Sequence, residues 1–194
     1  SYFIALNTFG GVPKVTETTI DANRNIARAA KAEILLFIIE DLMEALGKLP
    51  AEPPSAAYAG EYTVRALLAK LYLYQKNYTN AEQFATEVIA SGLYALEPKF
   101  ETLVTEDFTE EAILEVGYTL SDAPGTDGNI GLNNLFVGRR EIIPSNQAVV
   151  ALASVESGDR FSSISFNVNQ LNGNDNGWSV AKYGTADQDN NNVV

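Results

Sequence analysis

The chain has 194 residues, of which 46% are hydrophobic and 20% are charged, and this is the composition of a globular protein rather than a disordered chain. Twenty-five acidic residues against 13 basic ones give a formal net charge of −12, which disfavours nucleic acid as a partner because phosphate groups are repelled. The absence of cysteine and histidine excludes disulfides, a Cys/His zinc site and catalysis by a Ser-His-Asp or Cys-His arrangement.

The first half of the chain has the periodicity of helices. Residues 2–6 (YFIAL) are apolar, and the Gly-Gly and Pro of residues 9–13 (FGGVP) end any helix that begins there. From about Asn23 to Gly47, apolar residues recur near the helical period at positions 34, 38, 42 and 46, which predicts a long helix that ends before Pro50. The longest apolar run, residues 34–39, is much shorter than the roughly 18 residues that a membrane span requires.

Two further helices are predicted over residues 62–76 and 80–91. The connection between them is so short that they must form an antiparallel helical hairpin. Residues 79–82 (TNAE) fit a capping box, in which the Thr hydroxyl and the Glu carboxylate each accept a hydrogen bond from the other residue's backbone N–H. Gly92 is predicted to end the second helix in a left-handed conformation.

The predicted hairpin partly matches the tetratricopeptide pattern. Leu68, Ala69 and Tyr72 lie on the first helix, Tyr78 lies at the turn, and Ala81 opens the second helix. The alanines would let the helices approach closely, and the larger residues would fill the groove between them. An ordinary apolar helical hairpin is the alternative interpretation. One such unit cannot bury its own apolar face, so other helices must cover it.

The second half of the chain is richer in loops. Alternation predicts strands at residues 114–118 and 164–168, and a short helix over residues 145–154 is entered through Pro144. Residues 121–134 and the region after Asn169 are rich in Gly, Asn and Asp and are predicted to be loops. We therefore expect a mainly α fold of tetratricopeptide-like helical hairpins (an α-α superhelix) over residues 1–98, with an irregular, loop-rich part carrying short strands over residues 99–194.

Several segments, taken in order, resemble the SusD/RagB family of outer-membrane nutrient-binding lipoproteins. Residues 9–13 are similar to the family's Phe-Gly-x-Val-Pro, and residues 41–50 (DLMEALGKLP) are similar to its Asp-Leu-x-x-Ala helix end. Residues 66–74 (ALLAKLYLY), followed by Tyr78, Ala81 and residues 88–89, are similar to its most recognisable stretch. The resemblance continues with residues 110–116 (EEAILEV), 144–145 (PS), 158–160 (GDR) and 182–183 (KY).

This resemblance implies a single SusD-like portion from the interior of a longer protein. It also implies a surface-exposed, non-catalytic protein of the bacterial outer membrane, which binds oligosaccharide or polysaccharide and delivers it to a TonB-dependent transporter. Such proteins are anchored through a lipid on a cysteine, which would lie outside this segment. No cofactor is implied.

Candidate ligand residues follow from what sugar binding requires, namely flat apolar rings flanked by amide or guanidinium groups. The predicted loops contain the chain's only tryptophan and other residues of these types. The candidates are Trp178, Tyr183, Phe136, Asn134 and Arg139. Core packing is the alternative for each aromatic residue.

Other functions are weighed against glycan binding. Tetratricopeptide arrays commonly serve as protein–protein interaction scaffolds, which is the main alternative. An acid/base glycosidase would require two carboxylates that converge beside an aromatic cleft. Asn172, Asn174 and Asn176 loosely imitate a calcium loop, but its first position lacks Asp and its twelfth is Tyr183, so no metal site is predicted.

Overall fold

The computed structural model describes residues 2–100, 102–117, 135–136 and 139–182. Its contacts divide the chain into two compact units, Ser1–Pro53 with Ala59–Ala90 and Pro54–Tyr58 with Ser91–Val194. Helices dominate the described residues and the strands are short, so the predicted mainly α fold class is confirmed. Among these residues, no helix combines the length and apolar character needed to span a bilayer.

The first unit begins with helix α1 and a small strand pair. Its first elements are α1 (Tyr2–Phe9), β1 (Val12–Pro13), α2 (Ile20–Asn23), β2 (Arg28–Ala29) and α3 (Lys31–Leu46). Strands β1 and β2 pair antiparallel. They approach so closely at Gly11 that a Cβ there would lie 2.5 Å from the Ala29 carbonyl oxygen. The predicted start of the long helix near Asn23 is therefore wrong, because β2 uses the residues just before Lys31 to pair with β1.

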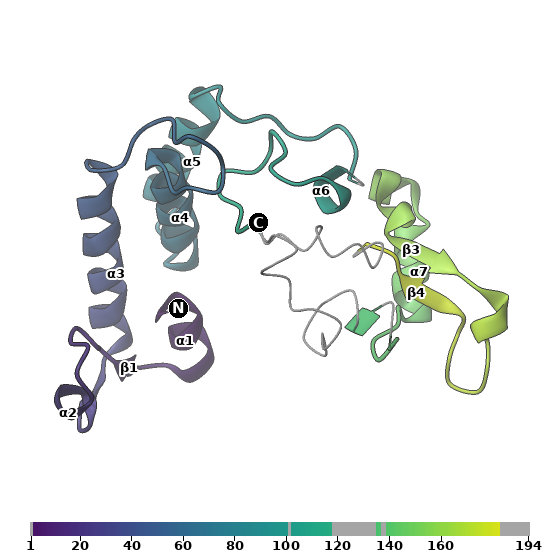
Figure 1. Ribbon diagram of the computed structural model, residues 1–194, viewed down its shortest axis with the longest axis horizontal. Coiled ribbons are helices and arrows are strands. Elements are labelled where there is room, and N and C mark those ends of the chain that lie inside the picture. Colours follow the sequence, from purple (N-terminus) through teal and green to yellow (C-terminus); the bar gives the residue numbers. More distant parts are fainter. Residues whose placement is uncertain (1, 101, 118–134, 137–138, 183–194) are drawn as a thin grey trace. The chain divides into compact units, whose positions relative to one another are not determined.

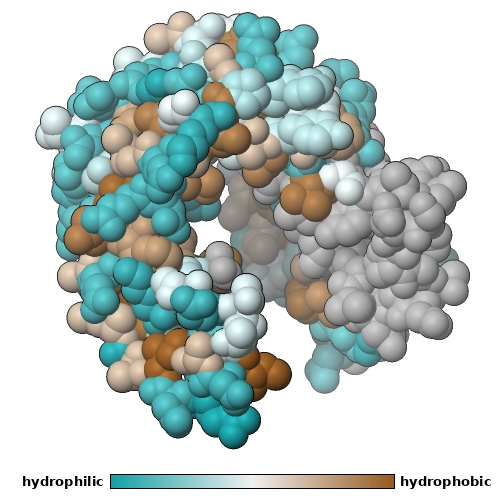
Figure 2. Space-filling view, turned by 60° about the vertical axis from the view of Figure 1, so that its left-hand side comes forward, coloured by the Kyte–Doolittle hydropathy of each residue, from teal (hydrophilic) through white to brown (hydrophobic). Residues whose placement is uncertain are grey.

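Leu6, Val12 and Ile34 form a buried core between α1, β1 and α3. The Tyr2 ring contributes by packing edge-on against Phe37, with ring centroids 5.9 Å apart. In Figure 1, α1 lies beside the N-terminal half of α3. Figure 2, which brings this side forward, shows polar and apolar side chains mixed over the surface.

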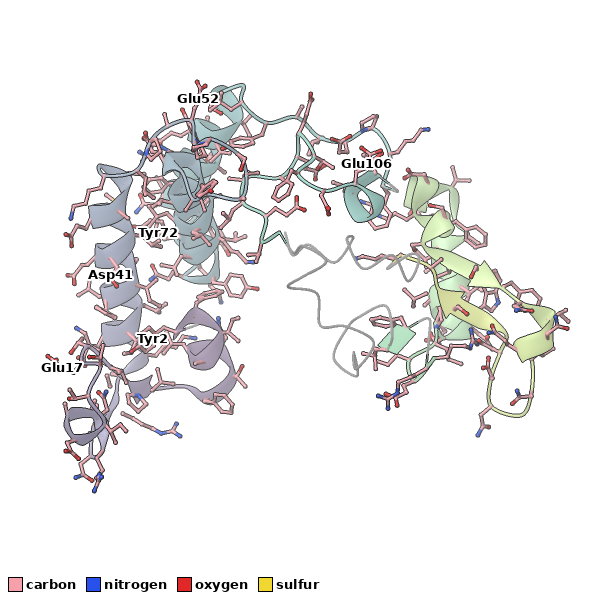
Figure 3. All side chains as sticks on the ribbon, viewed as in Figure 1. Tyr2, Glu17, Asp41, Glu52, Tyr72 and Glu106 are labelled. Carbon is pink, nitrogen blue, oxygen red and sulfur yellow. The ribbon has the colours of Figure 1, made fainter. Side chains whose placement is uncertain are left out.

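Helices α4 (Glu61–Tyr74) and α5 (Tyr78–Ala90) form the predicted helical hairpin. Val64, Leu68 and Phe84 are its buried core, and half-buried apolar residues of α3 pack against this core. Figure 3 shows Tyr72 on the side of α4 that faces α3, and Asp41 on α3. Ala81 is buried, as expected from the tetratricopeptide pattern. Phe84, which the tetratricopeptide pattern did not indicate, fills the groove between the two helices.

The ends of α5 confirm one predicted cap and contradict the other. Gly92 has a φ of 67°, the left-handed conformation predicted for it. The capping box at residues 79–82 is wrong, because α5 begins at Tyr78 and already includes Thr79. Instead, the side-chain oxygen of Asn77 accepts a hydrogen bond from the Asn80 N–H at 3.3 Å.

A half-buried ion network also joins the two helices of the hairpin. The guanidinium of Arg65 on α4 pairs with Glu61 one turn earlier and with Glu87 on α5. The hydrogen bond that the Arg65 guanidinium donates to the Glu61 carboxylate is the main cause that raises the pKa of Arg65 above its ordinary value. The network therefore adds a polar link to the apolar core between α4 and α5.

The second unit contains short elements. These are α6 (Thr102–Thr105), α7 (Asn146–Leu152), the 3-10 helix η2 (Val155–Ser163), β3 (Ile164–Phe166), the 3-10 helix η3 (Val168–Gln170) and β4 (Trp178–Val180). The predicted helix after Pro144 is confirmed as α7, and the Ser145 side chain accepts a hydrogen bond from the Ala148 N–H to cap it. Strand β3 ends at Phe166, two residues before the predicted end, because Val168 begins η3.

The predicted strand over residues 114–118 is not formed in its described part, residues 114–117. Within that part only Val116 forms a bridge, and its side chain is 52% exposed. Glu115, which alternation placed on the opposite face, is instead 2% exposed. Its carboxylate accepts a hydrogen bond from the Phe108 N–H at 2.8 Å, which explains how a charged residue can be buried here. Tyr118 and the predicted loop 121–134 lie outside the described residues.

Candidate functional site

The candidate site lies on the β-hairpin, which we define as β3, β4 and the connecting residues 167–177. The strands pair antiparallel, with Ile164 opposite Val180 and Phe166 opposite Trp178. Figure 1 shows the two strands side by side, joined by a long loop. Because side chains alternate along a strand, Phe166 and Trp178 share one face of the hairpin, and Ser165 and Ser179 share the other.

Three aromatic rings, two on the strands of this hairpin and one on η2, come together and form what we call the aromatic cluster. The Trp178 ring lies 5.3 Å from the Phe166 ring, tilted by 52°, and 5.8 Å from the Phe161 ring, edge-on at 69°. Phe166 is 52% exposed and Phe161 is 40% exposed, while Trp178 is half-buried. The cluster thus offers apolar ring surface to solvent while its rings support one another.

Gly177 makes the position of the Phe166 ring possible. Its φ is 78°, in the region that favours glycine. A Cβ at this position would lie 2.7 Å from Cε2 of Phe166 and 3.2 Å from the Asn167 carbonyl oxygen. Any larger residue would therefore displace the ring or the turn.

The amide side chains of the connecting residues form hydrogen bonds within the second unit. The Asn176 amide donates to the Pro144 carbonyl at 2.8 Å and to the Asn146 side-chain oxygen at 3.0 Å. Its own oxygen accepts from the Trp178 N–H at 3.2 Å. The Asn167 side chain accepts from the Asn169 N–H at 3.0 Å. These amides hold the shape of the loop that leads into β4, where Trp178 lies.

Arg140 joins the hairpin to a preceding segment of the chain. Its Nη2 donates to both carboxylate oxygens of Asp175, at 2.8 and 2.9 Å, and to the Trp178 carbonyl at 3.2 Å. Its Nη1 donates to the Ser179 hydroxyl. The hydrogen bond from Arg140, followed by the one from the Gly177 N–H, lowers the pKa of Asp175 below its ordinary value.

The carboxylate of Asp175 is thus engaged by a guanidinium and a backbone amide rather than directed at an ion. No group of three or more Asp or Glu side chains within the described ranges has the arrangement needed to hold a metal.

Of the candidate residues predicted from sequence, the structure places one in the aromatic cluster and two elsewhere, and the other two lie outside the described residues. Trp178 lies in the aromatic cluster, Phe136 is half-buried, and Arg139 is exposed and pairs with Glu141. Asn134 and Tyr183 lie outside the described residues. Phe161, Phe166 and Arg140 were not among the candidates predicted from sequence. The register that places Phe166 opposite Trp178 would have revealed one of them, but β4 was not predicted.

Of three comparisons with known proteins, only the one with solved structures finds similar proteins. No family model matches the chain, and no curated protein matches it.

Several solved structures have the same fold. One is a SusD superfamily protein from Bacteroides thetaiotaomicron, with a TM-score of 0.79 and 23% identity over 97% of this chain and 45% of that one. Another, described as a laminarin-binding SusD-like protein, gives 0.76 and 23% over 94% of this chain and 48% of that one. A SusD-like protein from Bacteroides fragilis is 29% identical over 63% of this chain and 26% of that one, with a TM-score of 0.54.

The chain therefore has the fold of SusD-like proteins, which confirms the sequence resemblance at the level of fold. It spans less than half the length of these three solved structures.

Proposed function

We propose that this chain, which has the fold of SusD-like proteins, is part of a protein of that family that binds an oligosaccharide or polysaccharide without transforming it. The observation that carries the proposal is the aromatic cluster, whose rings are partly open to solvent on a hairpin fixed by hydrogen bonds. Sugars bind to such surfaces because the apolar face of a pyranose ring packs against an aromatic ring. A fold alone does not determine function, so the site must be tested directly.

Trp178 is the central ring of the proposed site, because it contacts both other rings of the cluster. Phe166 is the more exposed of its two neighbours and extends the surface. Phe136, Asn134, Arg139 and Tyr183 remain candidates for contacts with the sugar hydroxyl groups or rings. Their amide, guanidinium and phenol groups are suited to that role.

The whole protein would act at the surface of the bacterial outer membrane. We propose that it passes its ligand to a TonB-dependent transporter and is held there by a lipid anchor that lies outside this segment. The fold likeness supports this role, and one of the similar structures is described as laminarin-binding. Immunoprecipitation of the full-length protein from outer membranes should recover a TonB-dependent transporter. Failure to recover one would contradict the partnership.

Binding is tested by calorimetric titration of the chain with a panel of soluble polysaccharides that includes laminarin. Trp178→Ala should weaken the affinity of the parent's best ligand by roughly 1 to 3 kcal/mol, by analogy with other aromatic stacking contacts. Trp178→Phe is the matched control, because it keeps an aromatic ring and should retain more affinity. Equal affinity of parent and Trp178→Ala would remove this residue from the site.

The absence of catalysis is tested with the same panel by product analysis after long incubation. We expect no cleavage. Cleavage that a single Asp or Glu substitution abolishes would contradict the proposal and favour a glycosidase.

A further inference from the structure

Arg140 approaches the β-hairpin from the face opposite the aromatic cluster. Ser179 alternates with Trp178 along β4, so its hydroxyl lies on the other side of the strand from the Trp178 ring. Arg140 binds that hydroxyl and the Trp178 backbone carbonyl rather than a ring of the cluster. Any effect of Arg140 on the Trp178 ring therefore acts through the backbone of β4.

The same guanidinium fixes the turn that precedes β4. Asp175 accepts from Arg140 with both carboxylate oxygens, and its Oδ1 also accepts from the Gly177 N–H at 2.8 Å. Gly177 is the residue against which the Phe166 ring packs. The Arg140 side chain thus connects the turn at Gly177, which contacts Phe166, with the strand that carries Trp178.

Two features distinguish Arg140 from a surface arginine. Its side chain is only 12% exposed. Its backbone has a φ of 51°, which is uncommon for a residue other than glycine and persists only where surrounding contacts hold it. The adjacent Arg139 is the natural comparison, because it is exposed and pairs with Glu141 two residues away.

We propose that Arg140 is the positioning residue of the aromatic cluster. It holds the turn and β4 in the one arrangement in which Phe166 and Trp178 present a common surface. The surface is then formed before the ligand arrives, and preorganisation of this kind strengthens binding because little conformational freedom is lost on association. The role in ligand binding rests on the proposed function, whereas the effect on Trp178 does not.

The effect on Trp178 is measured without a ligand. Trp178 is the chain's only tryptophan, so near-ultraviolet circular dichroism in the tryptophan band and acrylamide quenching of its fluorescence report on this ring alone. We expect Arg140→Gln to lose most of the tryptophan dichroism and to become more accessible to acrylamide, with an unchanged far-ultraviolet spectrum. Arg140→Lys should restore only part of the signal, because a single ammonium cannot form the forked contacts. Arg139→Gln should match the parent.

A parent-like tryptophan signal in Arg140→Gln would overturn the proposal. If that variant does not fold, Asp175→Asn takes its place, because it weakens the same contact and keeps the arginine. A parent-like signal in Asp175→Asn would then overturn the proposal in the same way.

The effect on binding is measured by titration with laminarin and the other polysaccharides of the panel. We expect Arg140→Gln to bind the parent's ligand about tenfold more weakly, as when the support of a binding residue is lost. Arg24→Gln, which removes an exposed ion pair with Asp21, is the control. Unchanged affinity in a variant with altered dichroism would overturn the role in binding. A parent that binds no polysaccharide would contradict the proposed function, and the dichroism would still decide whether Arg140 positions Trp178.

Discussion

The rings of Tyr72 on α4 and Phe84 on α5 lie parallel, with centroids 5.8 Å apart and an interplanar angle of 4°. Phe84 is 8% exposed and belongs to the core that Val64 and Leu68 complete. The pair links the two helices within this core, against which Tyr72 packs. The stability of the helical hairpin should therefore depend on it.

Phe84→Ala should lower the free energy of unfolding by about 3 to 5 kcal/mol, because it removes a buried ring and leaves a cavity. Urea unfolding followed by circular dichroism measures this change. Ile89→Ala is the control on the same helix, since Ile89 is exposed and its loss should change stability by no more than about 0.5 kcal/mol. Equal effects of the two substitutions would contradict the assignment of Phe84 to the core.

Ala81→Leu should destabilise the chain by about 1 to 3 kcal/mol, because Ala81 is buried on α5 and the added methyl groups overpack its surroundings. Ala69→Leu should have a smaller effect in the same direction, since Ala69 is only half-buried. Thermal unfolding of each variant tests the order. Ala90→Leu, at an exposed position of α5, should leave the melting temperature near that of the parent.

Gly177→Ala should destabilise the β-hairpin for two reasons, the positive φ and the close approach of the Phe166 ring. Gly173→Ala is a matched control, because Gly173 also has a positive φ but has no atom within 4 Å of an added Cβ. The left-handed conformation alone costs about 1 to 2 kcal/mol, so Gly177→Ala should exceed that range and Gly173→Ala should not. Comparison of both melting temperatures decides the point, and similar losses would show that the ring does not crowd Gly177.

Stability should fall in acid partly through Asp175. Its pKa in the folded chain is lower than the ordinary value of 3.8, so its contribution is fully present above that pH. The contribution is lost as the pH falls below 3.8 through the folded pKa, because protonation ends the attraction to Arg140. Melting temperatures measured between neutral pH and pH 2.5 should therefore show a shallower acid decline for Asp175→Asn than for the parent. In an Arg140→Gln background, Asp175→Asn should change the decline much less.

The helices of the first unit could largely be predicted from sequence because apolar residues at the helical period must be buried. The errors arose where a specific contact replaced a local preference. Asn77 caps α5 in place of Thr79, and β2 occupies residues that periodicity alone assigned to the long helix. Glu115 is buried because its carboxylate accepts a hydrogen bond from the Phe108 N–H. The alternation of polar and apolar residues in the sequence contains no information about that partner.

The candidate site could be predicted only in part. Trp178 was selected for its residue type, and the structure places it among other aromatic rings. Arg139 and Arg140 are the same residue type at adjacent positions, so no local pattern separates them. What distinguishes Arg140 is a backbone angle and a carboxylate 35 residues away, and both depend on the folded chain.

The separation of Arg140 from Asp175 also has a consequence for the order of folding. Tyr72 and Phe84 are joined by a short stretch of chain, whereas the contact of Arg140 with Asp175 closes a loop of 35 residues. Closing the longer loop costs about 1 kcal/mol more in chain entropy, and no helix pair brings its ends together. Local contacts form faster than distant ones, so the helical hairpin should be complete while the aromatic cluster is still unassembled.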